Sequence, residues 1–126
     1  MVAGEYAVHQ IDSGAQVIQV FESWAHQCSP ADFDRFAKPA AMKTIQYIKD
    51  KRPDVPVIYY ANGGSGYLEK QRDMGADMIA VDWHVDMEAA RERLPNIPIS
   101  GNGEETKQRK ARANTRARAS CNQRSL

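Results

Sequence analysis

Three short apolar runs, each ending abruptly in polar or glycine residues, constrain the fold of this chain most strongly. The runs end at Glu22-Ser23, Asn62-Gly63-Gly64 and Asp82-Trp83, and a stretch with helical spacing follows each of them. Repeated strand-then-helix units are typical of parallel sheets and barrels, which carry their chemistry at the carboxyl ends of the strands. The sequence therefore predicts an α/β fold with its functional groups along one edge of the sheet.

The same patterns give a full set of expected elements. Strands are predicted at 17–21, 57–61, 78–82 and 97–100, and helices at 3–13, 30–52, 67–74 and 86–94. Gly14 is expected to stop the first helix, and Asp86 to cap the last. The first strand is rich in β-branched residues and is expected to be buried on both faces. Because each helix returns the chain to the same edge, the strands should pair in parallel.

The second helix has the clearest signals. Ser29 is a predicted N-cap, Pro30 suits the first helical position, and Asp32 lies where the helix dipole favours an acid. Its predicted buried stripe consists of Phe33, Phe36, Ala37, Ala41, Ile45 and Ile48. Pro39 lies inside this stretch and should kink the helix or split it.

Composition limits the protein class. The 126 residues suit one small domain, and no run approaches the ~18 apolar residues of a membrane span, so we expect no membrane partner. The first six residues lack the basic-then-apolar order of a secretory signal and the Arg- and Ser-rich character of a transit peptide. Cys28 and Cys121 lie too far apart along the chain to suggest a disulfide framework.

Charge is divided unevenly along the chain. Residues 1–100 carry a net charge of −4 and residues 101–126 a net charge of +5. Residues 103–126 contain almost no large apolar side chain, so they are predicted to form a disordered basic tail. The tail lacks interleaved aromatic residues for base stacking, and we therefore expect no nucleic-acid partner.

Polar residues at the strand ends are the candidate site, and each has a structural alternative. The Ser23 hydroxyl can donate to a ligand carboxylate or cap a local turn. The glycine-rich stretch 62–66 can cradle an anion or simply form a tight turn, and it lacks the Lys-Ser/Thr of a Walker loop. Asp82 can act as a base, a metal ligand or an orienting group, or accept hydrogen bonds from neighbouring amides, and Glu22 is similarly ambiguous.

A metal site has little support in the sequence. His26 and Cys28 are metal-ligand residue types, but two ligands do not make a zinc site and no third ligand follows at a recognisable spacing. We therefore expect no bound metal.

Five segments together resemble the uroporphyrinogen decarboxylase family, in order and spacing. They are Gln10–Gln16, Phe21–Ala25, Ser29-Pro30-x-x-Phe33, Gly63-Gly64-x-Gly66-x-Leu68-Glu69 and Val81–Asp86. The resemblance covers about residues 5–102. It implies that residues 1–102 are the later part of a TIM (β/α)₈ barrel whose family needs no metal or organic cofactor. The implied reaction converts the four acetate side chains of uroporphyrinogen III to methyl groups and yields coproporphyrinogen III, in haem and chlorophyll biosynthesis.

The resemblance also implies site residues and omissions. Ser23 matches a substrate-binding hydroxyl residue, and Phe21 matches an aromatic wall of the substrate cleft. The family's basic substrate-gripping motif, its aspartate at the pyrrole nitrogens and its cleft tyrosine would lie upstream, and its late histidine downstream. No catalytic residue is therefore expected in this chain. After Gly101-Asn102 the family pattern stops, which suggests a frame shift, a retained intron or an annotation error in residues 103–126.

Several alternatives follow from this partial match. One alternative is that the isolated chain is a half-barrel fragment without activity, since two strand edges would lie unpaired. A related corrinoid or thiol methyltransferase would carry His-x-Cys where this chain has Tyr60-Ala61-Asn62. The resemblance further implies a homodimer for the full-length protein. The amino-acid sequence of residues 59–71 resembles that of family members from photosynthetic eukaryotes. This implies a plastid location if the source is such an organism, and a cytoplasmic location otherwise.

Overall fold

A computed structural model describes residues 2–101 of the chain. The elements follow one another as α1 (Val2–Asp12), β1 (Ile18–Glu22), η1 (Ala25–Gln27), α2 (Pro30–Asp32), η2 (Phe33–Ala37), α3 (Lys38–Lys51), β2 (Val57–Ala61), η3 (Gly64–Gln71), β3 (Met78–Ala80), α4 (Met87–Arg93) and β4 (Ile99–Ser100). The predicted disorder of residues 103–126 lies outside the described part.

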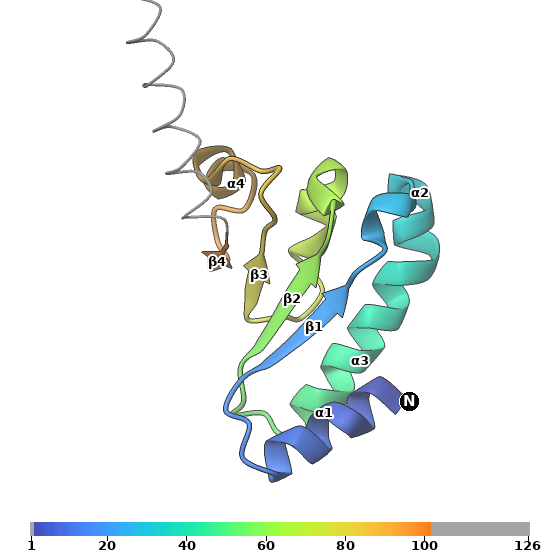
Figure 1. Cartoon of the computed structure of the whole chain (residues 1–126), viewed down its shortest axis with the longest axis vertical. Coiled ribbons are helices and arrows are strands. Elements are labelled where there is room, and N and C mark those ends of the chain that lie inside the picture. Colours follow the sequence, from blue (N-terminus) through green and yellow to red (C-terminus); the bar gives the residue numbers. More distant parts are fainter. Residues whose placement is uncertain (1, 102–126) are drawn as a thin grey trace, which may run out of the picture.

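Within residues 2–101, four parallel strands form one sheet in the order β1-β2-β3-β4. Figure 1 shows α1 and α3 lying together beside β1, at one side of the sheet. The predicted parallel α/β fold is confirmed. Strands that are neighbours both in sequence and in the sheet, each separated by helical segments, are what a stretch of a (β/α)₈ barrel requires.

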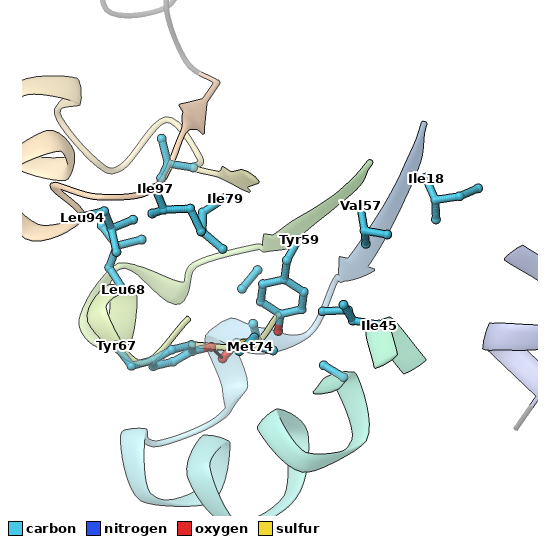
Figure 2. Packing of buried hydrophobic residues seen from close by; sticks show 14 of the residues in the cluster. Ile18, Ile45, Val57, Tyr59, Tyr67, Leu68, Met74, Ile79, Leu94 and Ile97 are labelled. Atoms are coloured by element: carbon cyan, nitrogen blue, oxygen red, sulfur yellow. Dashed lines mark hydrogen bonds between the residues drawn. The ribbon is translucent and has the colours of Figure 1, made fainter. Parts of the chain in front are cut away.

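The two faces of the sheet differ in what covers them. Paired residues on parallel strands point to the same face, and successive residues alternate between faces. The covered face, which packs against the helices, includes Ile18, Val57, Tyr59 and Ile79, all of which are buried. Figure 2 shows Val57, Tyr59 and Ile79 within this core.

The other face, which we call the open face, carries the alternate residues. It consists of Gln19, Phe21, Ile58, Tyr60, Met78, Ala80 and Ser100. Phe21 is 63% exposed, and Gln19 is exposed as well. The prediction that the first strand is buried on both faces is therefore wrong for the described part of the chain, because no other element there covers this face.

The long helical segment begins as predicted. The Asp32 N–H donates to Ser29 Oγ at 3.2 Å, and Pro30 occupies the first helical position. At the predicted kink, however, the structure has the π-helical turn η2, in which the Lys38 N–H donates to the Phe33 carbonyl, and α3 continues through Pro39. The π turn removes the need for a break, because it rearranges the hydrogen bonds just ahead of a residue that lacks an N–H.

The π turn also changes which side chains face the core. Phe33, Ala41, Ile45 and Ile48 are buried as predicted, but Phe36 is 61% exposed. A π turn holds one residue more than an α turn, so the face of the helix before it is displaced relative to the face after it. The prediction for Phe36 assumed an uninterrupted α-helical period and is wrong for that reason.

The remaining helices fit the sequence to different degrees. Asp86 caps α4 as predicted, since its carboxylate accepts hydrogen bonds from the Glu88 and Ala89 N–H groups. The helix predicted at 67–74 is instead the 3₁₀ segment η3, which starts at Gly64 and has a non-helical backbone at Tyr67. Tertiary contacts explain this shift, because the Tyr67 hydroxyl donates to the Ala25 carbonyl at 2.7 Å and its ring stacks on Phe33.

Among the helices described, none has both the length and the apolar character needed to cross a membrane.

Candidate functional site at the carboxyl ends of the strands

The polar ends of β1, β2 and β3 contact one another directly. The Asn62 N–H donates to the Glu22 carbonyl at 3.1 Å, and Asn62 Nδ2 donates to the Ser23 carbonyl at 3.2 Å. The Gly63 N–H donates to Asp82 Oδ2 at 2.6 Å. The structure therefore brings together three of the predicted site segments. We call this group, Glu22-Ser23, Asn62-Gly63 and Asp82, the rim.

Ser23 lies in the exposed turn that follows β1. It caps neither of the next two helical segments, because Trp24 occupies the N-cap position of η1 and Ser29 caps α2. The structure therefore does not support a helix cap for its hydroxyl. The predicted contact of Ser23 with substrate stays a prediction.

Phe21 lies on the open face just before the rim. Its ring meets Tyr60 of the neighbouring strand edge to face, with the centroids 5.5 Å apart and the planes at 67°. The pair presents aromatic surface that is reachable from the open face, since Phe21 is largely exposed. The predicted role of Phe21 as a cleft wall also stays a prediction.

The glycine-rich turn after β2 has a packing reason for its composition. Gly63 has a left-handed backbone with φ of +73°, and a Cβ on it would lie 2.4 Å from the Cβ of His26. A Cβ on Gly64 would lie 2.7 Å from Nε2 of Gln71, which donates to the Gly64 carbonyl. Because the Gly63 amide is already bonded to Asp82, the structure favours the tight turn over an anion cradle.

Asp82 is buried, with 5% of its surface exposed. Its Oδ2 accepts from the Gly63 N–H, and its Oδ1 accepts from the His84 N–H at 2.9 Å. The Nδ1 atom of His84 lies 3.4 Å from the same Oδ1. Of the roles open to Asp82 on sequence grounds, acceptor for neighbouring amides fits this geometry best.

Two exposed tryptophans flank the rim, each beside a histidine. Trp24 and His26 have ring centroids 5.8 Å apart, and Trp83 and His84 have centroids 3.6 Å apart. Trp24 was not proposed as a site residue from the sequence, and Asn62 was proposed only as part of the glycine-rich stretch 62–66. The Asn62–Ser23 contact had no sequence signal, because it joins residues 39 positions apart that only the β1–β2 register brings together.

Two tyrosines of the core, Tyr59 of β2 and Tyr67 of η3, are buried near the rim. The Tyr59 side chain is fully buried, and its hydroxyl has no hydrogen-bond partner among the described residues. Burial raises the pKa of Tyr59 above its usual range, with Glu22 as a secondary cause. Burial likewise raises the pKa of Tyr67 to about 12. Both hydroxyls therefore stay protonated at neutral pH.

An arginine of α4 binds to the segment that follows the glycine turn. Arg93 of α4 pairs with the Glu69 carboxylate of η3 and donates to the Ser65 carbonyl at 2.7 Å. The hydrogen bond from Arg93 lowers the pKa of Glu69 to about 2. This clamp holds η3, which begins directly after the glycine turn, against α4.

The candidate metal ligands are not assembled into a site. Within residues 2–101, no three His, Cys, Asp or Glu side chains lie close enough together to hold a metal ion. His26 instead packs against Gly63, and Cys28 lies partly buried beside the core.

Comparison with known proteins gives one consistent match. The sequence profile of the uroporphyrinogen decarboxylase (URO-D) family matches residues 1–106. "Uroporphyrinogen decarboxylase" of Prochlorococcus marinus (strain MIT 9515) is 49% identical over 100 residues, which cover 79% of this chain and 29% of that protein. The protein of the same name from Nostoc punctiforme (strain ATCC 29133 / PCC 73102) is 49% identical over 98 residues, which cover 77% of this chain and 28% of that protein.

A third relative agrees in extent. "Uroporphyrinogen decarboxylase" of Synechococcus sp. (strain CC9605) is 48% identical over 98 residues, which cover 77% of this chain and 28% of that protein. The chain thus spans less than a third of the length of the relatives it matches. Since the family profile covers most of the chain and the parallel βα order fits a barrel segment, this chain belongs to the uroporphyrinogen decarboxylase family.

Proposed function

We propose that residues 1–102 are a segment of a uroporphyrinogen decarboxylase, a carboxy-lyase that yields coproporphyrinogen III. The observation that carries this proposal is the match of about 49% identity over 100 residues to proteins of that name. The exposed rim at the carboxyl ends of the strands supports it, because parallel α/β folds bind substrates there.

The chemistry explains what such a rim must do. Protonation of a pyrrole ring makes it an electron sink, so the C–C bond to the acetate carboxylate breaks and its electron pair flows into the ring. Carbon dioxide leaves, a second proton adds to the remaining methylene to make the methyl group, and the ring loses the first proton and becomes aromatic again. One proton is consumed for each carboxylate lost. The protein must hold an octacarboxylate and stabilise a cationic intermediate, which is an electrostatic task.

Within this scheme, Ser23 and Phe21 are the proposed substrate contacts. The Ser23 hydroxyl lies exposed at the rim and can donate to a substrate carboxylate. Phe21 offers an exposed ring on the open face for contact with the flat faces of pyrrole rings. Neither residue supplies the electrostatic stabilisation of the intermediate, so both are proposed binding groups.

The proposal can be tested by grafting. Residues of this chain replace the matching 100 residues of the Prochlorococcus marinus relative, and the chimera is assayed for coproporphyrinogen formed from uroporphyrinogen III. We expect an active chimera in which Ser23→Ala lowers kcat/KM about 10-fold, the effect of losing one hydrogen bond to a charged group. Ser13→Ala, which alters an exposed serine that bonds within its own helix end, is the matched control. A folded but inactive chimera contradicts the proposal.

For the 126-residue chain alone we propose no turnover. Strands β1 and β4 are the sheet edges in the described part, and their outer sides offer unpaired backbone groups for self-association. Purified chain is incubated with uroporphyrinogen III under reducing conditions, and products are separated by chromatography. Formation of coproporphyrinogen would overturn this part of the proposal, whereas its absence together with an active chimera would support it.

Assembly, pathway and location extend the proposal. We propose a homodimer for the full-length protein, and a plastid location with a role in chlorophyll synthesis if the source is a photosynthetic eukaryote, or a cytoplasmic location otherwise. The cyanobacterial relatives are compatible with a photosynthetic source. Sequencing the locus on both sides of this reading frame, followed by sedimentation and localisation of the full product, tests all three points. The same sequencing tests the boundary proposed at residue 102.

A further inference from the structure

We infer that Asp82 is a positioning residue for Ser23 and acts on it through the Asn62-Gly63 turn. This inference rests on the proposed function only for what Ser23 binds. The path itself consists of contacts among described residues that lie far apart in the sequence. It runs from the end of β3, through the end of β2, to the end of β1.

The first step joins β3 to β2. The Asp82 carboxylate is almost fully buried and accepts the Gly63 N–H at 2.6 Å. A buried carboxylate in a charge-assisted hydrogen bond holds its donor firmly, because breaking the bond leaves a charge without solvation. Its second oxygen accepts the His84 N–H, so the carboxylate is itself fixed from both sides.

The second step makes the position of Gly63 matter. Its left-handed backbone places it against His26, so closely that no Cβ fits between them. His26 belongs to η1, three residues after Ser23. A displacement of Gly63 therefore reaches the turn after β1 through direct packing as well as through the chain.

The third step joins β2 to Ser23. Asn62 immediately precedes Gly63, and its Nδ2 donates to the Ser23 carbonyl at 3.2 Å while its N–H donates to the Glu22 carbonyl. These two bonds hold the peptide groups on either side of the Ser23 Cα. They fix the direction of the Ser23 Cα–Cβ bond and restrict the rotamers that its hydroxyl can adopt, because the allowed χ1 rotamers depend on the backbone dihedrals.

The inference predicts an ordered pattern of effects. Asp82→Asn keeps the size of the side chain but removes its charge and one acceptor oxygen. The bonds to the Gly63 and His84 amides can then not both persist, and whichever remains loses its charge assistance. Asn62→Ala removes only the bond to the Ser23 carbonyl. The first variant should therefore disturb both Gly63 and Ser23, and the second should disturb Ser23 while the Gly63–Asp82 bond persists.

Amide NMR and hydrogen exchange on the 126-residue chain test this pattern without any ligand. We expect Asp82→Asn to speed exchange of the Gly63 amide about 10- to 100-fold and to shift the Ser23 and Trp24 resonances, with the β2 amides still protected. Asp54→Asn, at the exposed opposite end of the sheet, is the charge-matched control and should leave these signals unchanged. A change at Gly63 without one at Ser23 or Trp24 overturns the inference, and so does no change at all.

A second variant covers loss of fold. If Asp82→Asn removes protection throughout β2, the Asn62→Ala variant tests the path instead. Shifted Ser23 and Trp24 resonances with a Gly63 amide that stays protected from exchange support the path. Unchanged Ser23 and Trp24 resonances overturn it. In the active chimera, Asp82→Asn and Ser23→Ala should each lower kcat/KM, and the double variant should lose no more than the larger single loss. Additive losses there indicate a merely structural Asp82. An inactive chimera with the expected NMR pattern would contradict the proposed function and leave the positioning path standing.

Discussion

The covered and open faces of the sheet are built from the same strands but differ in how deeply their side chains are buried. On the covered face, Val57, Tyr59 and Ile79 are completely buried against the helical layer. On the open face, the paired residues Phe21 and Tyr60 contact each other, yet Phe21 is mostly exposed. The comparison shows that the stability of the described part resides in one face, while the other face retains apolar surface for a partner or ligand.

The rim shows a related contrast between groups that hold the backbone and groups that face solvent. Asp82 and the Arg93–Glu69 clamp fix the turns through hydrogen bonds, whereas Phe21 lies on the open face just before the rim with its ring exposed. Substitutions on each face should accordingly separate folding from binding.

The largest expected effect comes from emptying the covered face. Ile79→Ala removes a fully buried side chain and should lower the free energy of unfolding by about 2–5 kcal/mol. The matched open-face change, Phe21→Ala, should cost less than about 1 kcal/mol, because most of that ring is already in contact with water. Urea unfolding followed by circular dichroism measures both. Equal losses in the two variants would show that the open face is covered in solution.

A smaller effect is expected from the clamp that fastens the rim. The pKa of Glu69 is lowered to about 2 from an ordinary value of 4.5, so the Arg93 pair stabilises the fold above pH ~4.5 and this stabilisation is lost as the pH falls toward 2. Since the carboxylate is half exposed, Glu69→Gln should cost only about 0.5–1 kcal/mol at pH 7 and nothing near pH 2.

Unfolding free energies of the two proteins at pH 7 and at pH 2 measure that difference. Glu92→Gln, an exposed acid on the same helix as Arg93, is the control and should show no comparable pH-dependent loss. A Glu69→Gln penalty that stays the same at both pH values would indicate that packing, not charge, is responsible.

The smallest effect concerns one oxygen atom on each face. Tyr59→Phe removes a buried hydroxyl without a partner among the described residues and should leave stability unchanged or raise it by up to about 1 kcal/mol. Tyr60→Phe, on the open face, is the neighbouring control. Differential scanning calorimetry reports both as shifts in Tm. A clear drop for Tyr59→Phe would reveal an ordered water that satisfies its hydroxyl.

Sequence patterns predicted the strands and helix starts well because these depend on local chemistry. The parallel sheet, the Ser29 and Asp86 caps and the stop at Gly14, which has φ of +112°, are all present. The failures have two causes. Phe36 and Pro39 were misjudged because a π turn interrupts the α-helical period, whereas the segment after Gly64 responds to contacts far along the chain. The Tyr67 hydrogen bond to Ala25, which bends η3, spans 42 positions.

The rim followed the same rule. Its members could be proposed from strand ends, because the carboxyl ends of parallel strands must meet at one edge. Their mutual bonds could not be proposed, since the Asp82–Gly63 and Asn62–Ser23 pairs depend on backbone register and turn geometry. The proposed substrate contacts of Ser23 and Phe21 do not follow from the geometry of the strands, and they rest on the family resemblance.

The π turn gives the long helix a spare residue. In an unbroken α-helix, Phe33 would lie about 120° around the axis from Ile45, too far to share its buried stripe. The turn absorbs one position and reduces that angle to about 20°, which lets Phe33 reach Tyr67 beneath the sheet. Deleting one residue between 34 and 37 would therefore restore ordinary helical geometry without rotating Phe33 away from the core. The length of the helix can change at this point at less cost than along α3. A deletion within α3 would rotate the residues on one side of it around the axis and turn the buried ones away from the core.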